Sequence, residues 1–387
     1  MNSDASASFR LIVTGGGTGG HTYPALTAVQ ALTDRLAARG RSLDVLWIGT
    51  AEGLEARVAP AAGIPFTTVA TGKIRRSSNP LKLVSPANVR DMARVPLGVA
   101  QARKIVSRFR PDVVLATGGY VAVPAGLAAR MCHRPLVLHE QTVRLGLANR
   151  KLAGSATRIA VSSESTLPLL PPEVQSAAVV TGNPIRPEVL TGHADKAVAA
   201  LGLNGFDRNL PTVYVTGGAQ GAQQINDVVR DALPWLLERA NVVHQCGIAH
   251  VEDLQRYTAA LPANLGRRYH LTGFVGPELP DVLALADLVI SRSGAGTLAE
   301  LTAVGKPAVF IPLASSAGNE QAHNARYLEE SGAAVALLGD VTADTLRAVA
   351  EPLLTDPERR AVMADRSRAH GRPDAADRLV DVILSAA

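Results

Sequence analysis

The sequence predicts an α/β protein with two doubly wound parallel-sheet domains that face each other across a cleft. Short apolar runs alternate with longer helical patterns along the 387 residues, an order typical of parallel sheets covered by helices. The pattern also restarts, because two Thr-Gly-Gly units that follow apolar strands begin at Thr14 and Thr216. A chain of this length exceeds the size at which single cores stop growing. Ligands of such sheets bind at the carboxyl ends of the strands.

Seven apolar runs in the first half of the chain are predicted to be strands, because each is short and ends at glycine or another turn residue. A helical pattern covers Pro24–Arg39, after the first strand. Further on, "GNPIRPEVL" at 182–190 is predicted to be a proline-stiffened hinge. The strands are predicted at Phe9–Val13, Asp44–Ile48, Phe66–Val69, Val113–Ala116, Leu136–His139, Arg158–Val161 and Ala178–Thr181.

Six more strands are predicted after the hinge by the same pattern. The helical pattern of Ala222–Arg239 follows the first of them, as a helix follows the first strand of the first half. The two halves therefore repeat one architecture. The strands are predicted at Thr212–Thr216, Asn241–Cys246, Tyr269–Thr272, Leu288–Ser291, Ala308–Pro312 and Ala333–Leu337.

Both Thr-Gly-Gly loops have the composition of phosphate-binding loops, since glycine lets backbone amides approach an anion at a helix N-terminus. The first, "GGGTGGH", satisfies Gly-x-Gly-x-x-Gly, which alone is weak evidence for a dinucleotide. A dinucleotide site also needs an acidic residue after the second strand. That strand ends "LWIGT", and the nearest acid is Glu52 in the following loop. No Gly-Lys-Ser/Thr follows either loop, which excludes a P-loop nucleotidase.

The sequence offers no usual metal-binding set for a diphosphate, because it contains no Asp-x-Asp. Cys132 and Cys246 match no metal or redox spacing, and we interpret them as small buried side chains. We therefore expect a diphosphate held by backbone amides and helix ends, without a tightly bound cofactor. Assistance by a divalent ion stays open.

A third glycine-rich segment lies within Ile290–Ala334. After a predicted strand comes "SGAG", and Thr297 is expected to open a helix whose dipole can meet a phosphate. Glu300 follows three residues later. It either forms a capping box with Thr297 or accepts hydrogen bonds from ribose hydroxyls. On a second helix start, "GNEQAHNA" supplies polar side chains suited to a sugar. Two such starts within thirty residues favour a nucleotide-sugar site.

His21 ends the first glycine loop, where it is either a general base or a residue that caps or packs the helix start. A basic block between Lys73 and Arg110 holds ten basic residues and one acidic one, interleaved with apolar side chains. Such a block fits an anionic membrane surface, a nucleic acid or a solvated helix face. The apolar interleaving favours lipid over nucleic acid. The N-terminus lacks the pattern of a signal peptide, so we expect a cytoplasmic protein.

One family shares these motifs. The chain carries, in order, "GGTGGHTYPALTAVQAL", "TGGYVAVPAGLAAR", "LVLHEQTVRLGLANRKLA", "VTGNPIRPEVL", "GGAQGAQQIND", "SRSGAGTLAEL" and "GNEQAHNARYL". Over about residues 11–378 these resemble the successive motifs of the MurG family, in glycosyltransferase family 28. The resemblance implies a GT-B fold: a Rossmann-like acceptor and membrane domain at 1–183, joined by a C-terminal helix at 373–387, and a Rossmann-like donor domain at 184–372.

The same resemblance implies an inverting hexosyltransferase. It would move N-acetylglucosamine from UDP-N-acetylglucosamine to the muramoyl 4-hydroxyl of undecaprenyl-diphospho-muramoylpentapeptide. That step converts lipid I to lipid II in peptidoglycan synthesis and so serves cell shape and division. The enzyme would be a peripheral protein of the cytoplasmic face of the membrane. The patch that would meet the membrane comprises Lys73, Arg75, Arg76, Lys82, Arg90 and Arg94.

The resemblance also implies which residues form the site, because each lies in one of the matching motifs. His21 is the candidate base, and Arg186 at the hinge should face the donor. Val275 should meet uracil with its backbone, and Gln321 should hold the hydroxyls of N-acetylglucosamine. The remaining expected phosphate- and donor-binding residues are Thr18, Gly19, Gly20, Thr142, Gly218, Ala219, Gln220, Ala295, Gly296, Thr297, Leu298, Ala299 and Glu300.

Two positions depart from the family pattern, at places where substrate is held. Thr142 stands where the family usually has asparagine, and Ala219 stands where it usually has serine. A threonine cannot present an amide, and one lost neutral hydrogen bond costs roughly 0.5–1.5 kcal/mol. Because of these changes, one alternative stays open: a related enzyme that glycosylates a natural product or another lipid-linked acceptor. A non-catalytic nucleotide-sugar, anion or dinucleotide-binding protein is the remaining alternative.

Overall fold

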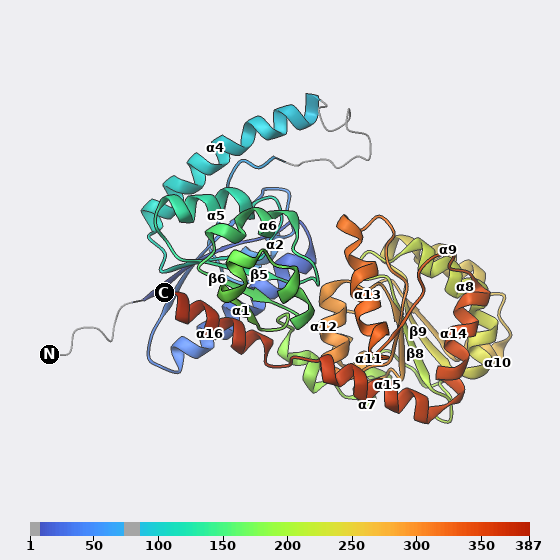
Figure 1. Ribbon diagram of the computed structural model, residues 1–387. Helices are drawn as coiled ribbons and strands as arrows, with labels where there is room; N and C mark the ends of the chain where they lie inside the picture. The colour runs from blue at the N-terminus through green and yellow to red at the C-terminus, as the bar shows by residue number, and fades with distance from the viewer. Residues whose placement is uncertain (1–7, 73–85) are drawn as a thin grey trace. The chain divides into compact units, whose positions relative to one another are not determined.

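The structure, a computed structural model, describes residues 8–72 and 86–387 (Figure 1). The chain forms two compact units. Unit 1 runs to Ile185 and also contains Asp374–Ala387, and unit 2 comprises Arg186–Pro373.

Unit 1 is built on a seven-stranded sheet with the order β3-β2-β1-β4-β5-β6-β7, in which all neighbouring strands are parallel. All seven predicted strands of the first half are confirmed, with ends that differ by at most one residue. They are β1 (Phe9–Thr14), β2 (Leu43–Gly49), β3 (Phe66–Thr68), β4 (Val113–Ala116), β5 (Leu136–Glu140), β6 (Arg158–Val161) and β7 (Ala178–Val180).

Helices cover both faces of this sheet, as expected for strands buried on two sides. On one face, α1 and α16 pack over β1, and α4 and α5 pack together over the other face. The α-helices are α1 (Gly19–Ala37), α2 (Glu55–Ala61), α4 (Pro86–Phe109), α5 (Ala122–Met131), α6 (Leu147–Leu152) and α16 (Ala375–Ala386). Short 3-10 helices span Ala153–Ser155, Glu164–Leu169 and Pro172–Ala177.

The last helix of the chain packs beside the first one (Figure 1). Leu379 and Ile383 of α16 are fully buried in one cluster with Leu32 of α1. At the edge of this contact, the Arg35 guanidinium pairs with Asp377 and Asp381 at 2.6 and 2.8 Å. Residues 374–387 are therefore part of the core of unit 1.

Unit 2 repeats the arrangement with a six-stranded parallel sheet of order β10-β9-β8-β11-β12-β13. All six predicted strands are confirmed: β8 (Thr212–Thr216), β9 (Asn241–Gln245), β10 (Tyr269–Thr272), β11 (Leu288–Ser291), β12 (Ala308–Phe310) and β13 (Val335–Ala336). The α-helices are α7 (Ala194–Ala200), α8 (Gln223–Arg239), α9 (Val251–Thr258), α10 (Ala263–Gly266), α11 (Leu279–Leu285), α12 (Ala295–Val304), α13 (Glu320–Glu330), α14 (Ala343–Thr355) and α15 (Pro357–His370). Pro187–Thr191, Ile248–His250 and Ala317–Asn319 form 3-10 helices.

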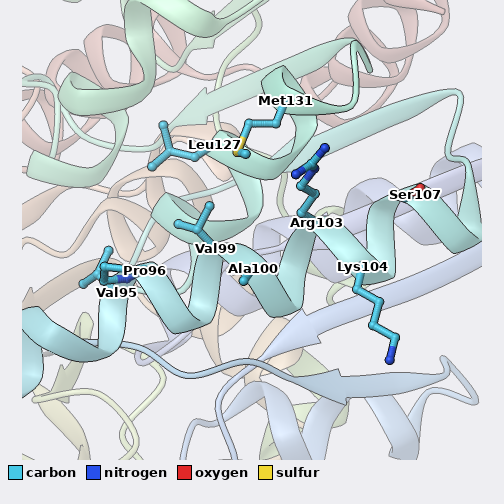
Figure 2. Close-up of a pocket in the computed structure, with 9 residues that line it drawn as sticks. All are labelled: Val95, Pro96, Val99, Ala100, Arg103, Lys104, Ser107, Leu127 and Met131. Carbon is cyan, nitrogen blue, oxygen red and sulfur yellow. The ribbon is translucent and has the colours of Figure 1, made fainter.

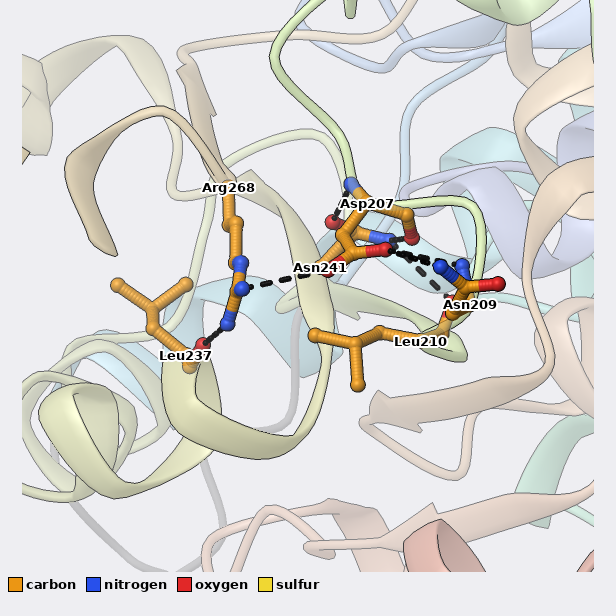
Figure 3. Close-up of polar contacts among 6 residues, drawn as sticks. All are labelled: Asp207, Asn209, Leu210, Leu237, Asn241 and Arg268. Carbon is orange, nitrogen blue, oxygen red and sulfur yellow. Dashed lines mark hydrogen bonds and ion pairs between the residues drawn. The ribbon is translucent and has the colours of Figure 1, made fainter. Parts of the chain in front are cut away.

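A polar cluster closes the amino end of the unit 2 sheet (Figure 3). Asn241 lies at the start of β9. Its side-chain Nδ2 donates to the Asp207 backbone carbonyl at 2.8 Å, and its Oδ1 accepts from the Asp207 backbone amide at 2.8 Å. The Arg268 guanidinium pairs with the Asp207 carboxylate at 3.3 Å and donates to the Leu237 carbonyl at 3.0 Å. These contacts join the segments that precede β8, β9 and β10 at the amino end of the sheet. The opposite, carboxyl end is where ligands of such sheets bind.

Both sheets have a point where the strand order reverses, between β1 and β4 in unit 1 and between β8 and β11 in unit 2. Open α/β sheets bind ligands at such points, outside the carboxyl ends of the strands. The two glycine loops follow β1 and β8, and the third glycine-rich segment follows β11. All three are therefore at the expected end of their sheets.

Two predicted helix starts are wrong. The first helix begins at Gly19 rather than Pro24, because the last residues of the glycine loop already adopt the helical conformation. Pro24 lies in the second turn and removes one hydrogen bond without ending the helix. The helix expected to open at Thr297 begins at Ala295, with Gly294 as its N-cap.

Candidate active site

A buried carboxylate holds the first glycine loop. Glu55, fully buried, accepts from the Gly17 amide at 2.9 Å with Oε2 and from the Thr50 amide and hydroxyl at 3.0 and 2.9 Å with Oε1. A Cβ on Gly16 would lie 2.1 Å from the Glu55 carboxyl carbon, and Gly17 has a φ of +88°. The glycines are therefore required by close approach and by backbone conformation.

The residues after these glycines form the N-terminus of α1. Thr18 is the N-cap, and Gly19 and Gly20 are the first two helical residues. Within residues 8–72 and 86–387, no protein group accepts the amide hydrogens of Gly19 and Gly20. Open amides at a helix N-terminus, with the positive end of its dipole, suit an anionic group.

His21 is half-buried in the first turn of the same helix. Its Nδ1 lies 2.9 Å from Oε1 of Gln141, and its backbone carbonyl accepts from the Thr117 hydroxyl at 2.9 Å. A Cβ on Gly118 would lie 2.9 Å from the His21 ring, so glycine at 118 lets the ring pack against the β4–α5 loop. The imidazole is thus held at the edge of the open helix N-terminus.

Thr142, one of the two departures from the family pattern, lies in the loop after β5. Its hydroxyl is 2.8 Å from Oε1 of Glu140 and 2.6 Å from the Arg144 carbonyl. Oε2 of the buried Glu140 accepts from the Gly146 amide and from Asn149. The Thr142 side chain therefore contacts its own loop, and its expected contact with substrate stays a prediction.

The second glycine loop presents free backbone amides. Gly218 has a φ of +85°, its amide donates to the Thr216 hydroxyl at 3.0 Å, and its carbonyl accepts from the Gly221 amide at 3.0 Å. This turn exposes Ala219 and Gln220. In the described part of the chain, nothing accepts their amide hydrogens. These backbone amides are therefore open whichever side chain stands at 219, and their binding of phosphate stays a prediction.

Gln245, buried at the end of β9, joins this loop to the expected uracil contact. Its Nε2 donates to the Gly218 carbonyl at 2.8 Å and to the Thr216 hydroxyl at 3.1 Å. Its Oε1 accepts from the Val275 amide at 2.9 Å and from the Tyr214 hydroxyl at 3.2 Å. Burial raises the pKa of Tyr214, so this hydroxyl stays protonated and donates. The Val275 carbonyl remains as the backbone group that could meet a base.

The first turn of α12 carries a third set of open amides. Those of Ala295, Gly296 and Thr297 have no acceptor in the described ranges, and Leu298 and Ala299 complete a half-buried first turn. Because the N-cap is Gly294, no capping box forms between Thr297 and Glu300. That alternative is wrong.

Glu300 instead pairs with Arg186, with 3.1 Å between the guanidinium and the carboxylate. The Glu300 side chain is 21% exposed and that of Arg186 is 43% exposed. Burial raises the pKa of Glu300 above its ordinary value, and Arg186 partly offsets this by attracting the ionised form. The structure thus brings Arg186, expected at the hinge, to the helix whose first turn is expected to bind phosphate.

Gln321 is the second residue of α13 and keeps its side-chain NH2 group available. Its Oε1 accepts from the Leu313 amide at 2.9 Å, and its carbonyl accepts from the Ser293 hydroxyl at 2.8 Å. Arg292 donates to the carbonyls of Ile311 and Pro312 in the same segment, at 2.9 and 3.0 Å. The Nε2 group of Gln321 has no acceptor in the part of the chain that the structure describes, so it can donate to a hydroxyl.

Sequence reasoning missed Glu55, Gln141, Gln245 and Arg292 as supporting residues. Only Gln141 had a local signal, since it lies in "HEQT" directly after a strand. In the cited contacts the other three act on residues 19 to 38 positions away, a separation that no short motif encodes.

Most residues of the expected membrane patch lie outside the residues that the structure describes. Lys73, Arg75, Arg76 and Lys82 lie outside the described residues, as does the side chain of Arg90, while Arg94 is exposed on α4. In the described ranges, no helix is long and apolar enough to cross a membrane. Across the same residues, no group of three or more His, Cys, Asp or Glu side chains could hold a metal ion.

Comparisons with known proteins show which family the chain is similar to. The models of the glycosyltransferase family 28 N-terminal and C-terminal domains match residues 11–161 and 212–379. The chain is 38% identical to the UDP-N-acetylglucosamine--N-acetylmuramyl-(pentapeptide) pyrophosphoryl-undecaprenol N-acetylglucosamine transferase of Burkholderia cenocepacia, over 97% of this chain and 96% of that one. It is 35% identical to the enzyme of the same name from Desulforudis audaxviator, over 97% of both chains.

Among solved structures, MurG from Acinetobacter baumannii superposes with a TM-score of 0.75 at 29% identity, covering 97% of this chain and 99% of that one. More distant likenesses at 15–20% identity, which include UDP-N-acetylglucosamine 2-epimerases, share the fold alone. Two doubly wound parallel sheets, glycine loops at both reversal points and full-length similarity lead to one assignment: the chain is a GT-B protein of glycosyltransferase family 28 and belongs to its MurG branch.

Proposed function

We propose that this chain transfers N-acetylglucosamine from UDP-N-acetylglucosamine to the muramoyl 4-hydroxyl of undecaprenyl-diphospho-muramoylpentapeptide, with inversion at the anomeric carbon. The observation that carries the proposal is the set of open amides in unit 2, in the Ala219–Gln220 loop and the first turn of α12. Together they offer positive ends of backbone dipoles to the diphosphate of a nucleotide sugar. Relatives named for this reaction align over the whole chain.

Donor recognition is assigned to unit 2. The Val275 carbonyl would accept from uracil, the Glu300 carboxylate from ribose hydroxyls, and the Gln321 amide would donate to the sugar. Arg186, paired with Glu300 at 3.1 Å, would stabilise negative charge on the departing UDP. These contacts support binding without a resident cofactor, although a divalent ion from solution can still assist the leaving group.

In the reaction, the muramoyl 4-oxygen attacks the anomeric carbon while its proton moves to Nε2 of His21. The new bond joins the acceptor oxygen to the anomeric carbon. The bond that breaks joins this carbon to the β-phosphate oxygen, which leaves with the electron pair as UDP. His21 is proposed as the base because its ring is held at the open N-terminus of α1.

We assign acceptor and membrane contact to unit 1. An apolar groove of about 700 Å³ runs between α4 and α5. Figure 2 shows Val95 and Val99 of α4 beside Leu127 of α5, with Arg103 and Lys104 one turn further along α4. Met131, which lines the groove, and Leu97 of α4 are exposed apolar side chains. Apolar side chains among cations suit an anionic lipid surface, which favours peripheral attachment at the cytoplasmic face.

The function is tested by measuring UDP release from UDP-N-acetylglucosamine with and without a soluble lipid I analogue. Release that depends on the analogue is the expected result and makes Thr142 and Ala219 tolerated variations. Tight binding of the nucleotide sugar without analogue-dependent release would refute lipid I as the acceptor. That result would favour the alternative function, a related enzyme with another acceptor.

A further inference from the structure

We propose that His139 and Gln141 are positioning residues that hold His21 in one tautomer, with hydrogen on Nδ1 and the lone pair on Nε2. The inference deepens the proposed function and rests on it for the identity of the base. It follows from a chain of three hydrogen bonds whose direction is set at two places by backbone carbonyls, which can only accept.

The first of these places is at Gly182. Nε2 of the fully buried His139 lies 3.1 Å from the Gly182 carbonyl oxygen, so this nitrogen must carry hydrogen. Burial lowers the pKa of His139 to about 4, so the ring is neutral at neutral pH. A neutral imidazole has one N–H, and Nδ1 of His139 is therefore an acceptor.

Gln141 transmits this direction. Its Nε2 lies 3.0 Å from Nδ1 of His139 and 3.0 Å from the His139 carbonyl oxygen. Both neighbours accept, so the amide group must face them with its two hydrogens. The flipped amide would bring Oε1 against two acceptors and lose both bonds. The Gln141 side-chain oxygen is thereby fixed toward His21.

This oxygen decides the tautomer of His21. Oε1 of Gln141 lies 2.9 Å from Nδ1 of His21 and can only accept, so Nδ1 carries the hydrogen. Nε2 then presents its lone pair, and no protein group in residues 8–72 and 86–387 lies within hydrogen-bond distance of it. The ring cannot turn freely, because Gly118 packs against it and the Thr117 hydroxyl holds the His21 carbonyl.

The arrangement matters chemically because only an unprotonated ring nitrogen can take the acceptor's proton. An imidazole without this partner exchanges between two tautomers, and the one with hydrogen on Nε2 is inert as a base at that atom. After transfer, the imidazolium keeps its Nδ1–H on a neutral amide oxygen.

The first test uses the full-length wild-type protein, with ¹⁵N-labelled histidine and long-range proton–nitrogen correlation spectra at pH 7.5. Each of the nine histidines gives a pattern that distinguishes the two neutral tautomers. The His21 and His139 signals are assigned as those missing from His21→Ala and His139→Gln. We expect hydrogen on Nδ1 of His21 and on Nε2 of His139. Hydrogen on Nε2 of His21 in the wild type would overturn the proposal.

The second test compares Gln141→Met with Gln175→Met. Methionine has the length of glutamine without its donors and acceptors, and the exposed Gln175 in unit 1 also donates to a backbone carbonyl, that of Leu170 at 3.1 Å. For Gln141→Met we expect His21 to gain the Nε2–H tautomer. Its kcat should fall about tenfold or more at unchanged KM for UDP-N-acetylglucosamine, up to the ~10²–10⁴-fold that a general base contributes.

Gln175→Met should keep the wild-type spectrum and kcat. A wild-type tautomer pattern or unchanged kcat in folded Gln141→Met would refute the positioning role. The proposed base is tested separately by His21→Ala. Full turnover of His21→Ala, with the expected tautomer in the wild type, would refute His21 as base and leave the hydrogen-bond direction established.

Discussion

Replacing Gln245 by methionine tests whether one buried side chain organises the donor half of the site. The wild-type amide makes four hydrogen bonds, to Thr216, Gly218, Tyr214 and Val275. Two of these partners keep another bond in the variant. The Thr216 hydroxyl still accepts from the Gly218 amide, and the Gly218 carbonyl still accepts from the Gly221 amide.

The other two partners are left as unsatisfied donors. The Val275 amide and the Tyr214 hydroxyl are both buried, and each orphaned donor costs roughly 1–3 kcal/mol. Gln245→Met should therefore lower the free energy of unfolding of unit 2 by about 2–6 kcal/mol. In a Tyr214→Phe background the same substitution orphans one donor instead of two, so its cost should fall by ~1–3 kcal/mol.

Urea unfolding of the full chain measures this, followed by the fluorescence of Trp235, the tryptophan of α8. A Trp47→Phe background in every variant removes the signal of the only other tryptophan. The matched control is Gln255→Met on the exposed side of α9, expected within about 0.5 kcal/mol of wild type. Calorimetric titration should show a Kd for UDP raised about tenfold or more, because binding must then order the loop at ~1–2 kcal/mol per residue. A variant that matches the control in both assays would refute the reasoning.

Three further predictions follow from single contacts. Glu300→Ala should raise the KM for UDP-N-acetylglucosamine about 10- to 150-fold, the equivalent of ~1.5–3 kcal/mol for hydrogen bonds to a charged group; an unchanged Kd for UDP would count against the ribose role. Leu379→Ala should destabilise unit 1 by about 2–5 kcal/mol, seen in urea unfolding, because it leaves a cavity between α16 and α1. His139 binds a proton in the unfolded chain below pH 6.5 but in the folded chain only below about 4, so its contribution to stability is lost as pH falls through this window. His139→Gln should therefore flatten the rise of unfolding free energy with pH between 4.5 and 6 by up to about 1.4 kcal/mol per pH unit, and an unaltered slope would refute the lowered pKa.

The strands were predictable from the sequence because a buried parallel strand is a short apolar run that ends at a turn residue. Helix starts were less predictable. Spacing suggested a capping box at Thr297 and Glu300, yet the helix starts two residues earlier, at Ala295. Its N-cap is Gly294, which needs no side-chain signal. The ion pair of Glu300 with Arg186 joins positions 114 residues apart. Such pairings depend on the sheet order and not on local composition.

The open amides of the candidate site follow from glycine positions that the sequence displays directly. The side chains that hold the loops could not be identified from the sequence in this way. Glu55 and Gln245 look like ordinary polar residues near strand ends, and only the folded backbone shows that each satisfies three or four donors and acceptors. The tautomer of His21 depends in the same way on Gln141, 120 positions away.

The return of α16 to unit 1 has a consequence for how the chain matures on the ribosome. Unit 2 is an insertion within unit 1, since the polypeptide leaves unit 1 after Ile185 and re-enters it at Asp374. Leu379, Val380 and Ile383 have no exposed surface once folded, so the apolar face of α1 stays uncovered until α16 has emerged. The inserted unit can complete its core during synthesis. The enclosing one is completed only when residues 374–387 have also emerged, which makes a nascent chain truncated before residue 374 prone to aggregate through α1.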